Sequence, residues 1–573
     1  MRFWSVLLAA VIAGAACAPI NPEPAPAPVP SEPARTPPAA TPPSAPAPTP
    51  APADRSAPLE VVPDRWWLLD AEIDGVYGAS VDRAYREILS QKQPQRQVVV
   101  AIIDSGVDIE HEDLDGVLWS NDGETRSGRD DDGNGYIDDV AGWNFIGGPG
   151  GTHVDEDTYE VTRLHATCQQ RHENMQRAAA LPASAVTSMT LTPAECAAIA
   201  ADFAAKRSEN QQMLMQVREM DTAVQGFVAL LQRELGPQEL TVERVRAMSP
   251  MRNEVRQAQQ VYLQLASNGI TPQMITDEIE RIDSLLENGL NPDFNPRAIV
   301  DDNPADPTER VYGNSDVTGP DASHGTGVAG IVAAERANGI GVDGVADNVR
   351  IMTIRAVPNG DERDKDIANA IRYAVDNGAH IINMSFGKAY SPNKDLVDTA
   401  VRHAEARGVL LVHAAGNDAK DLATEKNFPN RYYADGGVAQ NWIEVGASNW
   451  QGAGWLAAEF SNFGREQVDV FAPGATILAP LPGDDYAPNS GTSFAAPVVS
   501  GIAAILMSYY PQLSAADVRR IILESATRHG DQMVVRPGVP GSLIRFGDLS
   551  VTGAIVNAYE AVRMAEQLPP SMN

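Results

Sequence analysis

Continuous apolar segments of strand length alternate with amphipathic helical patterns along this chain. The apolar segments read VVVAIID, RIMTIRAV, HIINMSFG, GVLLVHAAGN and WIEVGAS, at positions 98–104, 350–357, 380–387, 408–417 and 442–448. Helical patterns such as DKDIANAIRYAVDNG lie between them. A strand that is apolar on both faces needs cover on both faces, which a parallel sheet obtains from the helices that connect its strands. The pattern therefore predicts an α/β fold, with helices on both faces of a parallel sheet.

The segment at 151–298 has a different character, because its apolar residues recur at helical spacing and strand-like runs are absent. The breakers GGPGG and NPDFNP bracket this segment, and residues 194–235 read as one long helix. We therefore expect an all-α insertion within the α/β domain. The predicted ranges are 59–150 and 299–568 for the two parts of the α/β domain, 151–298 for the insertion and 569–573 for a C-terminal tail.

The chain has three cysteines, too few for a disulfide scaffold or a cysteine-rich zinc cluster. Cys168 and Cys196 both lie in the predicted insertion. In an oxidising compartment these two residues either pair across a helical hairpin or remain free thiols, and the sequence leaves both possibilities open.

The N-terminus has the pattern of an export signal. Arg2 precedes an apolar run at residues 3–16 that is too short to span a bilayer. AGAAC, at the end of this run, resembles the lipobox of bacterial lipoprotein signals, although Gly14 stands where leucine is usual. This resemblance implies a signal at residues 1–17 and lipidation of Cys17; the alternative is ordinary cleavage in an Ala-rich stretch. The Pro- and Ala-rich residues 18–58 favour an extended polyproline II linker.

The formal charge of −32 limits the partners of this chain. Nucleic acid and anionic lipid surfaces are anionic too, so neither is an expected partner. Membrane contact is expected through a lipid anchor at most, in a cell-envelope lipoprotein facing the periplasm or the surface; the alternative is a secreted protein. No oligomeric state is predicted.

Three segments carry side chains that suit nucleophilic catalysis. AIIDSGVDIEHEDL places Asp104 at the end of a buried strand, whereas SHGTGVAGIVAA and GTSFAAPVVSGIAAIL place His324 and Ser493 at the starts of small-residue helices. Strand ends and helix N-termini meet along one edge of a parallel sheet. A serine hydroxyl is a weak nucleophile until a base such as histidine takes its proton, and a carboxylate fixes the histidine tautomer. Singly, each residue has an ordinary structural explanation, but together they predict a catalytic triad.

The motifs DSGVD, HGTGVAG and GTSFAAP resemble the Asp, His and Ser motifs of the subtilisin-like serine proteases, and they occur in the same order. The resemblance covers residues 66–150 and 299–565. It implies a subtilisin-like fold and an endopeptidase that works through an acyl-enzyme. One departure is Gly327, which stands where the family most often has histidine.

The same resemblance implies roles for further residues. HAAGND makes Asn417 the side-chain donor of an oxyanion hole, with the Ser493 backbone N–H as the second donor. NMSFG is similar to the strand edge on which an extended peptide substrate pairs by β-augmentation. The residues expected to line the substrate cleft are Ser385, Phe386 and Gly387 on that strand, and Ala415 and Gly416 at the primary specificity pocket.

DDDGNGYIDD, at 130–139, is similar to the first half of an EF-hand calcium loop. Position twelve of such a loop would be Ala141 rather than Glu, so an acidic solvated turn is the alternative. The expected calcium ligands are Asp130, Asp132, Asn134, the Tyr136 carbonyl and Asp138. Asp113 and Asn338 also match positions that hold a structural calcium in subtilisins.

The sequence therefore predicts an exported or envelope-anchored serine endopeptidase that cleaves proteins or peptides and holds structural calcium. One alternative is an inactive subtilisin-like protein that binds peptides in the same cleft. An α/β-hydrolase esterase is a second alternative, but it would need Gly-x-Ser-x-Gly and a serine that comes first in order. In this chain Ala495 replaces the last glycine, and Ser493 comes last.

Overall fold

The computed structural model describes residues 61–178, 191–304 and 306–568. The predicted signal with Cys17, the linker at 18–58 and the tail at 569–573 lie outside the described residues. The described residues belong to two compact units. One unit comprises Met215–Ile279, and the other comprises residues 61–214 and 280–568.

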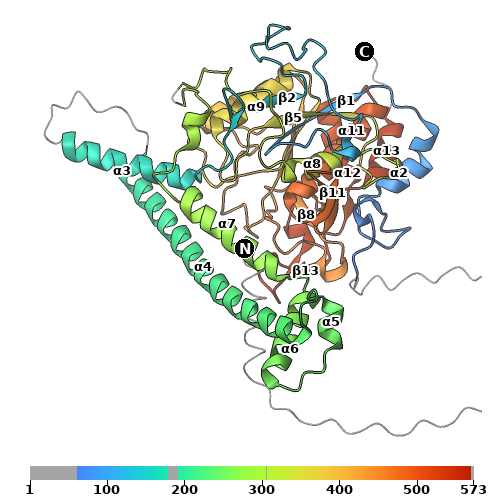
Figure 1. The fold of residues 1–573 in the computed structure, drawn as a ribbon. Coiled ribbons are helices and arrows are strands. Elements are labelled where there is room, and N and C mark those ends of the chain that lie inside the picture. Colours follow the sequence, from blue (N-terminus) through green and yellow to red (C-terminus); the bar gives the residue numbers. More distant parts are fainter. Residues whose placement is uncertain (1–60, 179–190, 305, 569–573) are drawn as a thin grey trace, which may run out of the picture. The chain divides into compact units, whose positions relative to one another are not determined.

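A nine-stranded sheet is the centre of the larger unit, in the order β12-β15-β9-β8-β7-β6-β1-β5-β2 (Figure 1). The ladders from β9 to β2 are all parallel, and β12 pairs antiparallel with β15 at one edge. The strands are β1 (Val98–Asp104), β2 (Gly142–Asn144), β5 (Val349–Arg355), β6 (Ile381–Met384), β7 (Leu410–Ala414), β8 (Trp442–Ser448), β9 (Val470–Pro473), β12 (Thr527–Arg528) and β15 (Ala554–Ile555). The predicted parallel α/β sheet is confirmed.

Helices cover both faces of the sheet. Alternate residues of β1 enter different cores: Val100 and Ile102 pack in the core that contains α8 and α11, whereas Ala101 and Ile103 pack in the core that contains α9 and α10. The helices of this unit around the sheet are α2 (Val81–Glu87), α8 (Ser323–Ala333), α9 (Asp364–Asp376), α10 (Lys394–Ala406), α11 (Thr492–Tyr509), α12 (Ala515–Ser525) and α13 (Ala558–Gln567).

Short antiparallel hairpins complete this unit. They are β3 (Gly147–Gly148) with β4 (Thr152–His153), β10 (Ile477–Leu481) with β11 (Asp485–Asn489), and β13 (Met533–Val535) with β14 (Leu543–Arg545). The β10–β11 hairpin directly precedes α11 and packs against α8.

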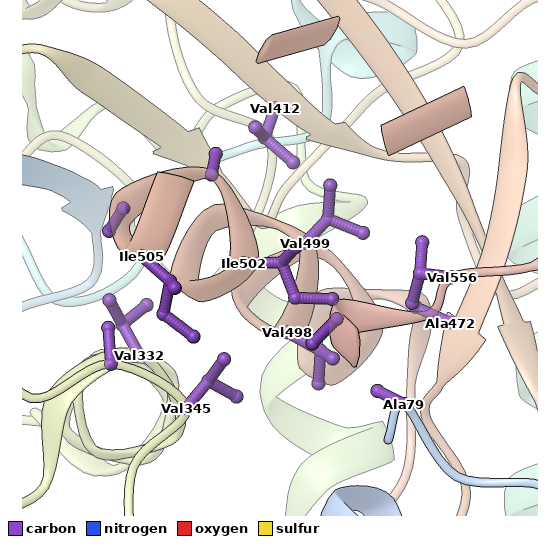
Figure 2. Close-up of a cluster of buried hydrophobic side chains, with 14 of the residues drawn as sticks. Ala79, Val332, Val345, Val412, Ala472, Val498, Val499, Ile502, Ile505 and Val556 are labelled. Atoms are coloured by element: carbon purple, nitrogen blue, oxygen red, sulfur yellow. The ribbon is translucent and has the colours of Figure 1, made fainter. Parts of the chain in front are cut away.

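Every residue of α11 is buried. Val498, Val499, Ile502 and Ile505 project from this helix into a core shared with the sheet and α8 (Figure 2). Among the described residues, α11 is the one helix long and apolar enough to cross a membrane, but it is wholly buried inside the protein. Its composition therefore reflects its central place in the core.

The predicted insertion is largely helical. Its helices are α3 (Glu160–Ala178), α4 (Pro193–Leu235), α5 (Val242–Ala247), α6 (Asn253–Ser267) and α7 (Pro272–Ser284), with a π-helical turn at Leu285–Gly289. The expected long helix at 194–235 corresponds to α4. A disulfide joins Cys168 of α3 to Cys196 of α4, so the pairing that the sequence left open is present. The Met215–Ile279 unit has a small core of its own, formed by Leu231, Val245, Val255 and Ala258.

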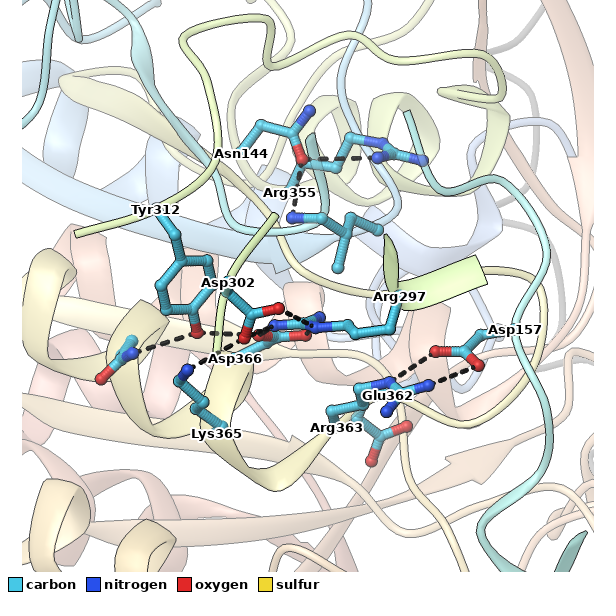
Figure 3. A network of polar contacts seen from close by, with 12 residues as sticks. Asn144, Asp157, Arg297, Asp302, Tyr312, Arg355, Glu362, Arg363, Lys365 and Asp366 are labelled. Atoms are coloured by element: carbon cyan, nitrogen blue, oxygen red, sulfur yellow. Dashed lines mark hydrogen bonds and ion pairs between the residues drawn. The ribbon is translucent and has the colours of Figure 1, made fainter. Parts of the chain in front are cut away.

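The unit that holds the sheet extends into the range expected for the insertion. Val154 lies in the sheet core, and the buried Arg355 side chain donates a hydrogen bond to its carbonyl at 2.7 Å. At the other end of the range, Arg297 forms a buried ion pair with Asp366 at 2.6 Å (Figure 3). Both ends of the 151–298 range are therefore built into the α/β unit, which helical periodicity alone does not reveal.

Replacement of Ile502 by alanine is expected to lower the free energy of unfolding by about 2–5 kcal/mol, because it leaves a cavity between α11 and the sheet. Urea denaturation followed by circular dichroism measures the loss. Val551→Ala is the control: that side chain is 53% exposed, so a change within roughly 0.5 kcal/mol is expected. Equal losses in the two variants would contradict the central role of α11.

Candidate active site

Asp104 and His324 meet where β1 ends and α8 begins. The His324 Nδ1 atom lies 2.7 Å from Asp104 Oδ1, and the same oxygen accepts a hydrogen bond from the Ser105 N–H at 2.8 Å. Asp104 is buried. Gly325 allows this approach, since a Cβ atom there would lie 2.0 Å from the Gly106 carbonyl oxygen. The carboxylate is therefore placed to fix the imidazole tautomer with Nε2 directed away from Asp104.

The environment of His324 raises the pKa of its imidazole above the ordinary value. Burial acts to lower the pKa, but the negative charge and hydrogen bond of Asp104 outweigh it, and the charge of Asp321 acts in the same direction. The imidazole side chain still keeps 38% of its surface exposed. Its ring contacts Phe494 edge-on, with centroids 5.5 Å apart, which brings it beside the start of α11.

Ser493 lies in the first turn of α11, next to Asn417. A Cβ atom built on Gly491 would lie 2.7 Å from Ser493 Oγ and 3.4 Å from Asn417 Nδ2, so the hydroxyl and the amide border the same small space. A glycine at this position keeps that space open. The structure thus brings together the expected nucleophile and the expected oxyanion donor.

Thr492 orients the Asn417 side chain. The Thr492 N–H and hydroxyl donate to Asn417 Oδ1 at 2.8 and 3.0 Å, so the amide nitrogen is left as the donor toward the site. The Thr492 hydroxyl also accepts the Gly416 N–H at 3.0 Å. Sequence analysis missed this residue, although its place directly before Ser493 was the available signal.

In the expected substrate segment at 385–387, Ser385 makes a different kind of contact from Phe386 and Gly387. The Ser385 hydroxyl donates to the Ser493 carbonyl at 2.8 Å and is buried, so this side chain supports α11. Within residues 61–178, 191–304 and 306–568, no backbone group of Phe386 or Gly387 has a backbone hydrogen-bond partner. These backbone groups directly after β6 are therefore free of backbone partners, as β-augmentation requires of an edge.

Two asparagines that sequence analysis missed hold the segment with Ala415 and Gly416. Asn427 and Asn462 both donate to the Ala415 carbonyl, at 3.1 and 2.8 Å. The Asn427 carboxamide also contacts the other wall, because a Cβ atom on Gly387 would lie 2.5 Å from its oxygen. Asn427 therefore joins the two expected walls of the pocket. No motif pointed to it, because it lies outside both segments, on the loop that follows the 415–416 segment.

The acidic loop brings three carboxylates together. Oxygens of Asp130, Asp132 and the buried Glu124 lie within 4.8 Å of one another. Oxygen ligands of this charge suit Ca²⁺, so the donor set fits the ion. Glu124 was missed because it precedes the motif. Glu124 and all of the expected side-chain ligands also accept hydrogen bonds within the loop. Glu124 Oε1 accepts the Asp131 N–H and Asp130 Oδ1 accepts the Gly133 N–H, just as Asn134 Oδ1 accepts the Tyr136 N–H and Asp138 accepts the N–H groups of Ser127 and Gly128.

The two residues of the second expected calcium position, Asp113 and Asn338, contact each other. Asn338 Nδ2 donates to Asp113 Oδ1 at 3.2 Å, and the Val342 N–H donates to Asp113 Oδ2 at 2.8 Å. Burial raises the pKa of the Asp113 carboxyl. The first of these hydrogen bonds joins Asp113 and Asn338 directly, and the second ties Asp113 to the loop at Val342.

Residues 95–539 match the subtilase family, peptidase S8. The chain belongs to this family. It is 42% identical over 187 residues to the thermophilic serine proteinase of Bacillus sp. (strain AK1). The aligned region covers 32% of this chain and 43% of that proteinase. Alkaline elastase YaB of Bacillus sp. (strain YaB) is 37% identical, over 36% of this chain and 51% of the relative. Subtilisin Savinase of Lederbergia lenta is 33% identical, over 45% of this chain and 87% of the relative. The chain spans about half the length of the first two relatives.

Replacement of Asp321 by asparagine is expected to lower the pKa of His324, because it removes a negative charge that stabilises the imidazolium. NMR titration of the imidazole protons measures this pKa in both proteins. Asp376→Asn is the matched control: Asp376 contacts His403, so the change removes an Asp–His pair elsewhere. An unchanged or higher His324 pKa in the Asp321 variant would contradict the electrostatic account.

Proposed function

We propose that this subtilase is a serine endopeptidase with Asp104, His324 and Ser493 as its catalytic triad. The observation that carries the proposal is the 2.7 Å contact between His324 and Asp104, beside the helix start that presents Ser493. The similarity to named proteinases supports the same reaction.

Each residue has a defined role in the proposed reaction. His324 Nε2 takes the Ser493 hydroxyl proton as Oγ attacks the scissile carbonyl, and Asp104 stabilises the imidazolium that forms. Asn417 Nδ2 and the Ser493 N–H donate to the oxyanion of the tetrahedral intermediate. The imidazolium then protonates the leaving amine, and an acyl-enzyme remains. Water, deprotonated by His324, hydrolyses the ester and restores Ser493.

Proteins or peptides are the proposed substrates. An extended peptide would add a strand to the free edge at Phe386 and Gly387, and the side chain before the scissile bond would enter between this segment and Ala415–Gly416. The Asn417 orientation by Thr492 supports a working enzyme rather than an inactive peptide-binding protein. Covalent labelling by a fluorophosphonate probe separates these two functions.

We also propose export to the cell envelope, with a lipid anchor at Cys17. The motivating observation is AGAAC followed by the Pro- and Ala-rich linker. The Cys168–Cys196 disulfide supports an oxidising compartment. Cys17→Ser moves an anchored protein from the membrane fraction to the soluble fraction, and continued membrane sedimentation of this variant would refute the anchor.

Ser493→Ala is expected to abolish peptide hydrolysis and fluorophosphonate labelling while the thermal midpoint stays within a few degrees. Loss of the nucleophile from a subtilisin costs roughly 10⁶-fold in kcat. A chromogenic peptide assay and a thermal melt measure the two effects. Ser500→Ala, in the same helix, is a control for the loss of a hydroxyl, since Ser500 bonds to Asn383 inside the core. Labelled, active Ser493→Ala protein would refute the triad.

Calcium is proposed to bind Glu124, Asp130 and Asp132 as a structural ion. A ligand that binds only the folded protein stabilises it by about 2.7 kcal/mol at one hundred times its Kd. Calcium is therefore expected to raise the thermal midpoint, and Glu124→Gln to weaken that rise. Glu110→Gln removes an exposed carboxylate of the same unit and is the control. A calcium response that Glu124→Gln leaves intact would place the ion elsewhere.

A further inference from the structure

A buried lysine ends the proposed substrate segment. Lys388 directly follows Gly387, and its side chain is 2% exposed. Its ammonium contacts carboxylates of Glu160 at 2.9 Å and Asp364 at 2.8 Å, and it donates to the Glu362 carbonyl at 2.7 Å. Its backbone pairs in both directions with Phe428. The contacts of Lys388 therefore fix the C-terminal end of the 385–387 segment.

The insertion supplies one of those carboxylates. Glu160 is the first residue of α3, and its N–H donates to Asp361 Oδ2 at 2.8 Å. Although burial acts to raise the pKa of Glu160, the charges of Lys388 and Arg163 lower it to about 2. Glu160 thus stays ionised, and a buried ion pair of this kind holds its partners in one geometry.

The chain just before α3 is anchored to the loop before α9, which contains Asp361, Glu362 and Arg363. Asp157 pairs with Arg363 at 2.7 Å, beside Glu362 (Figure 3). Arg163 donates to Glu160 at 2.7 Å and to the Glu362 carbonyl at 3.3 Å. The loop before α9 therefore connects the start of the insertion to Lys388.

The second helix of the insertion, α4, contacts Tyr390, two residues after Lys388. The Tyr390 hydroxyl donates to Asp202 of α4 at 2.9 Å, and its ring packs on a cluster that includes Val161 and Phe203. The disulfide between Cys168 and Cys196 joins the two helices that make these contacts. The expected substrate segment, α3 and the first part of α4, up to Leu214, are thus packed together within the larger unit.

We propose that the base of the insertion positions the substrate strand for extended peptides, with Glu160 as a positioning residue that acts through Lys388. This inference rests on the proposed protease function. It assigns the insertion base a role in the recognition of long substrates, which pair with the free edge at Phe386 and Gly387. A small acyl ester reaches Ser493 without pairing along that edge.

The test compares two substrates with the same residue before the scissile bond: a tetrapeptide anilide, which spans the strand edge, and an N-acetyl amino acid ester, which does not. Glu160→Gln is expected to lower the ratio of kcat/KM on the tetrapeptide to that on the ester by about tenfold, mainly through KM, because small misplacements of a positioning group have large kinetic effects. In this variant Lys388 keeps Asp364 and Arg163 keeps Asp157 as ionic partners, so each buried cation retains a carboxylate.

Tyr390→Phe is the second variant, since it removes only the hydroxyl that bonds to Asp202. A smaller fall in the ratio of kcat/KM on the tetrapeptide to that on the ester is expected. If Glu160→Gln does not fold, Tyr390→Phe alone tests the positioning role. Glu254→Gln is the matched control, because it removes an exposed ionic partner of Arg252 elsewhere in the insertion and is expected to leave the ratio unchanged.

The outcomes separate the two proposals. Equal losses on both substrates, or an unchanged ratio in both Glu160→Gln and Tyr390→Phe, would overturn the positioning role. Fluorophosphonate labelling of the unaltered protein is measured alongside, since a chain that is not labelled would refute the proposed protease function itself.

Discussion

The close packing of α11 against the parallel sheet is the constraint on which the site depends. Small residues make this approach possible: a Cβ atom on Gly474, directly after β9, would lie 3.0 Å from the Cβ atom of Ala495 in α11. Because the helix is held so near the sheet, its first turn reaches the strand ends. The Ser493 carbonyl is then fixed by Ser385, which follows β6, and the Thr492 hydroxyl reaches Asn417 beyond β7. Core packing and site geometry are thus parts of one arrangement.

Electrostatic interactions favour the contact between Asp104 and His324 that the packing makes possible. Asp104 is buried at the end of a strand, where its charge is poorly solvated, and the His324 imidazole provides a partner that can carry a positive charge. This pairing raises the pKa of His324 and stabilises the imidazolium. The protein thus places an imidazole, a carboxylate and a hydroxyl at one sheet edge.

The insertion is joined to the α/β unit by charge as well as by packing. Glu160, Arg163 and Lys388 form a buried cluster with the loop before α9. Because its members share buried ionic contacts, the cluster joins the insertion base to the segment that ends at Gly387. The Met215–Ile279 unit keeps a separate core.

Much of the α/β unit was predictable because its signals are local. Apolar runs located β1 and β8 to the residue, and the small-residue motifs placed His324 and Ser493 at helix starts. The short strands β9, β12 and β15 were missed, since two to four residues carry too little pattern to separate them from loops. Glu124 and Asn427 were missed for a different reason, because each meets its partners through contacts that no motif records.

The sequence by itself determined the alternation of strands and helices, the order of the three motifs and the helical character of residues 151–298, since each depends on neighbours along the chain. Only the tertiary structure decided that Cys168 and Cys196 pair, that Thr492 orients Asn417, and that Glu160 meets Lys388. Glu160 and Lys388 lie more than two hundred residues apart along the chain. Contacts at that separation form only when the sheet and the insertion base fold onto the same loop, so the burial that makes them strong is a property of the assembled structure.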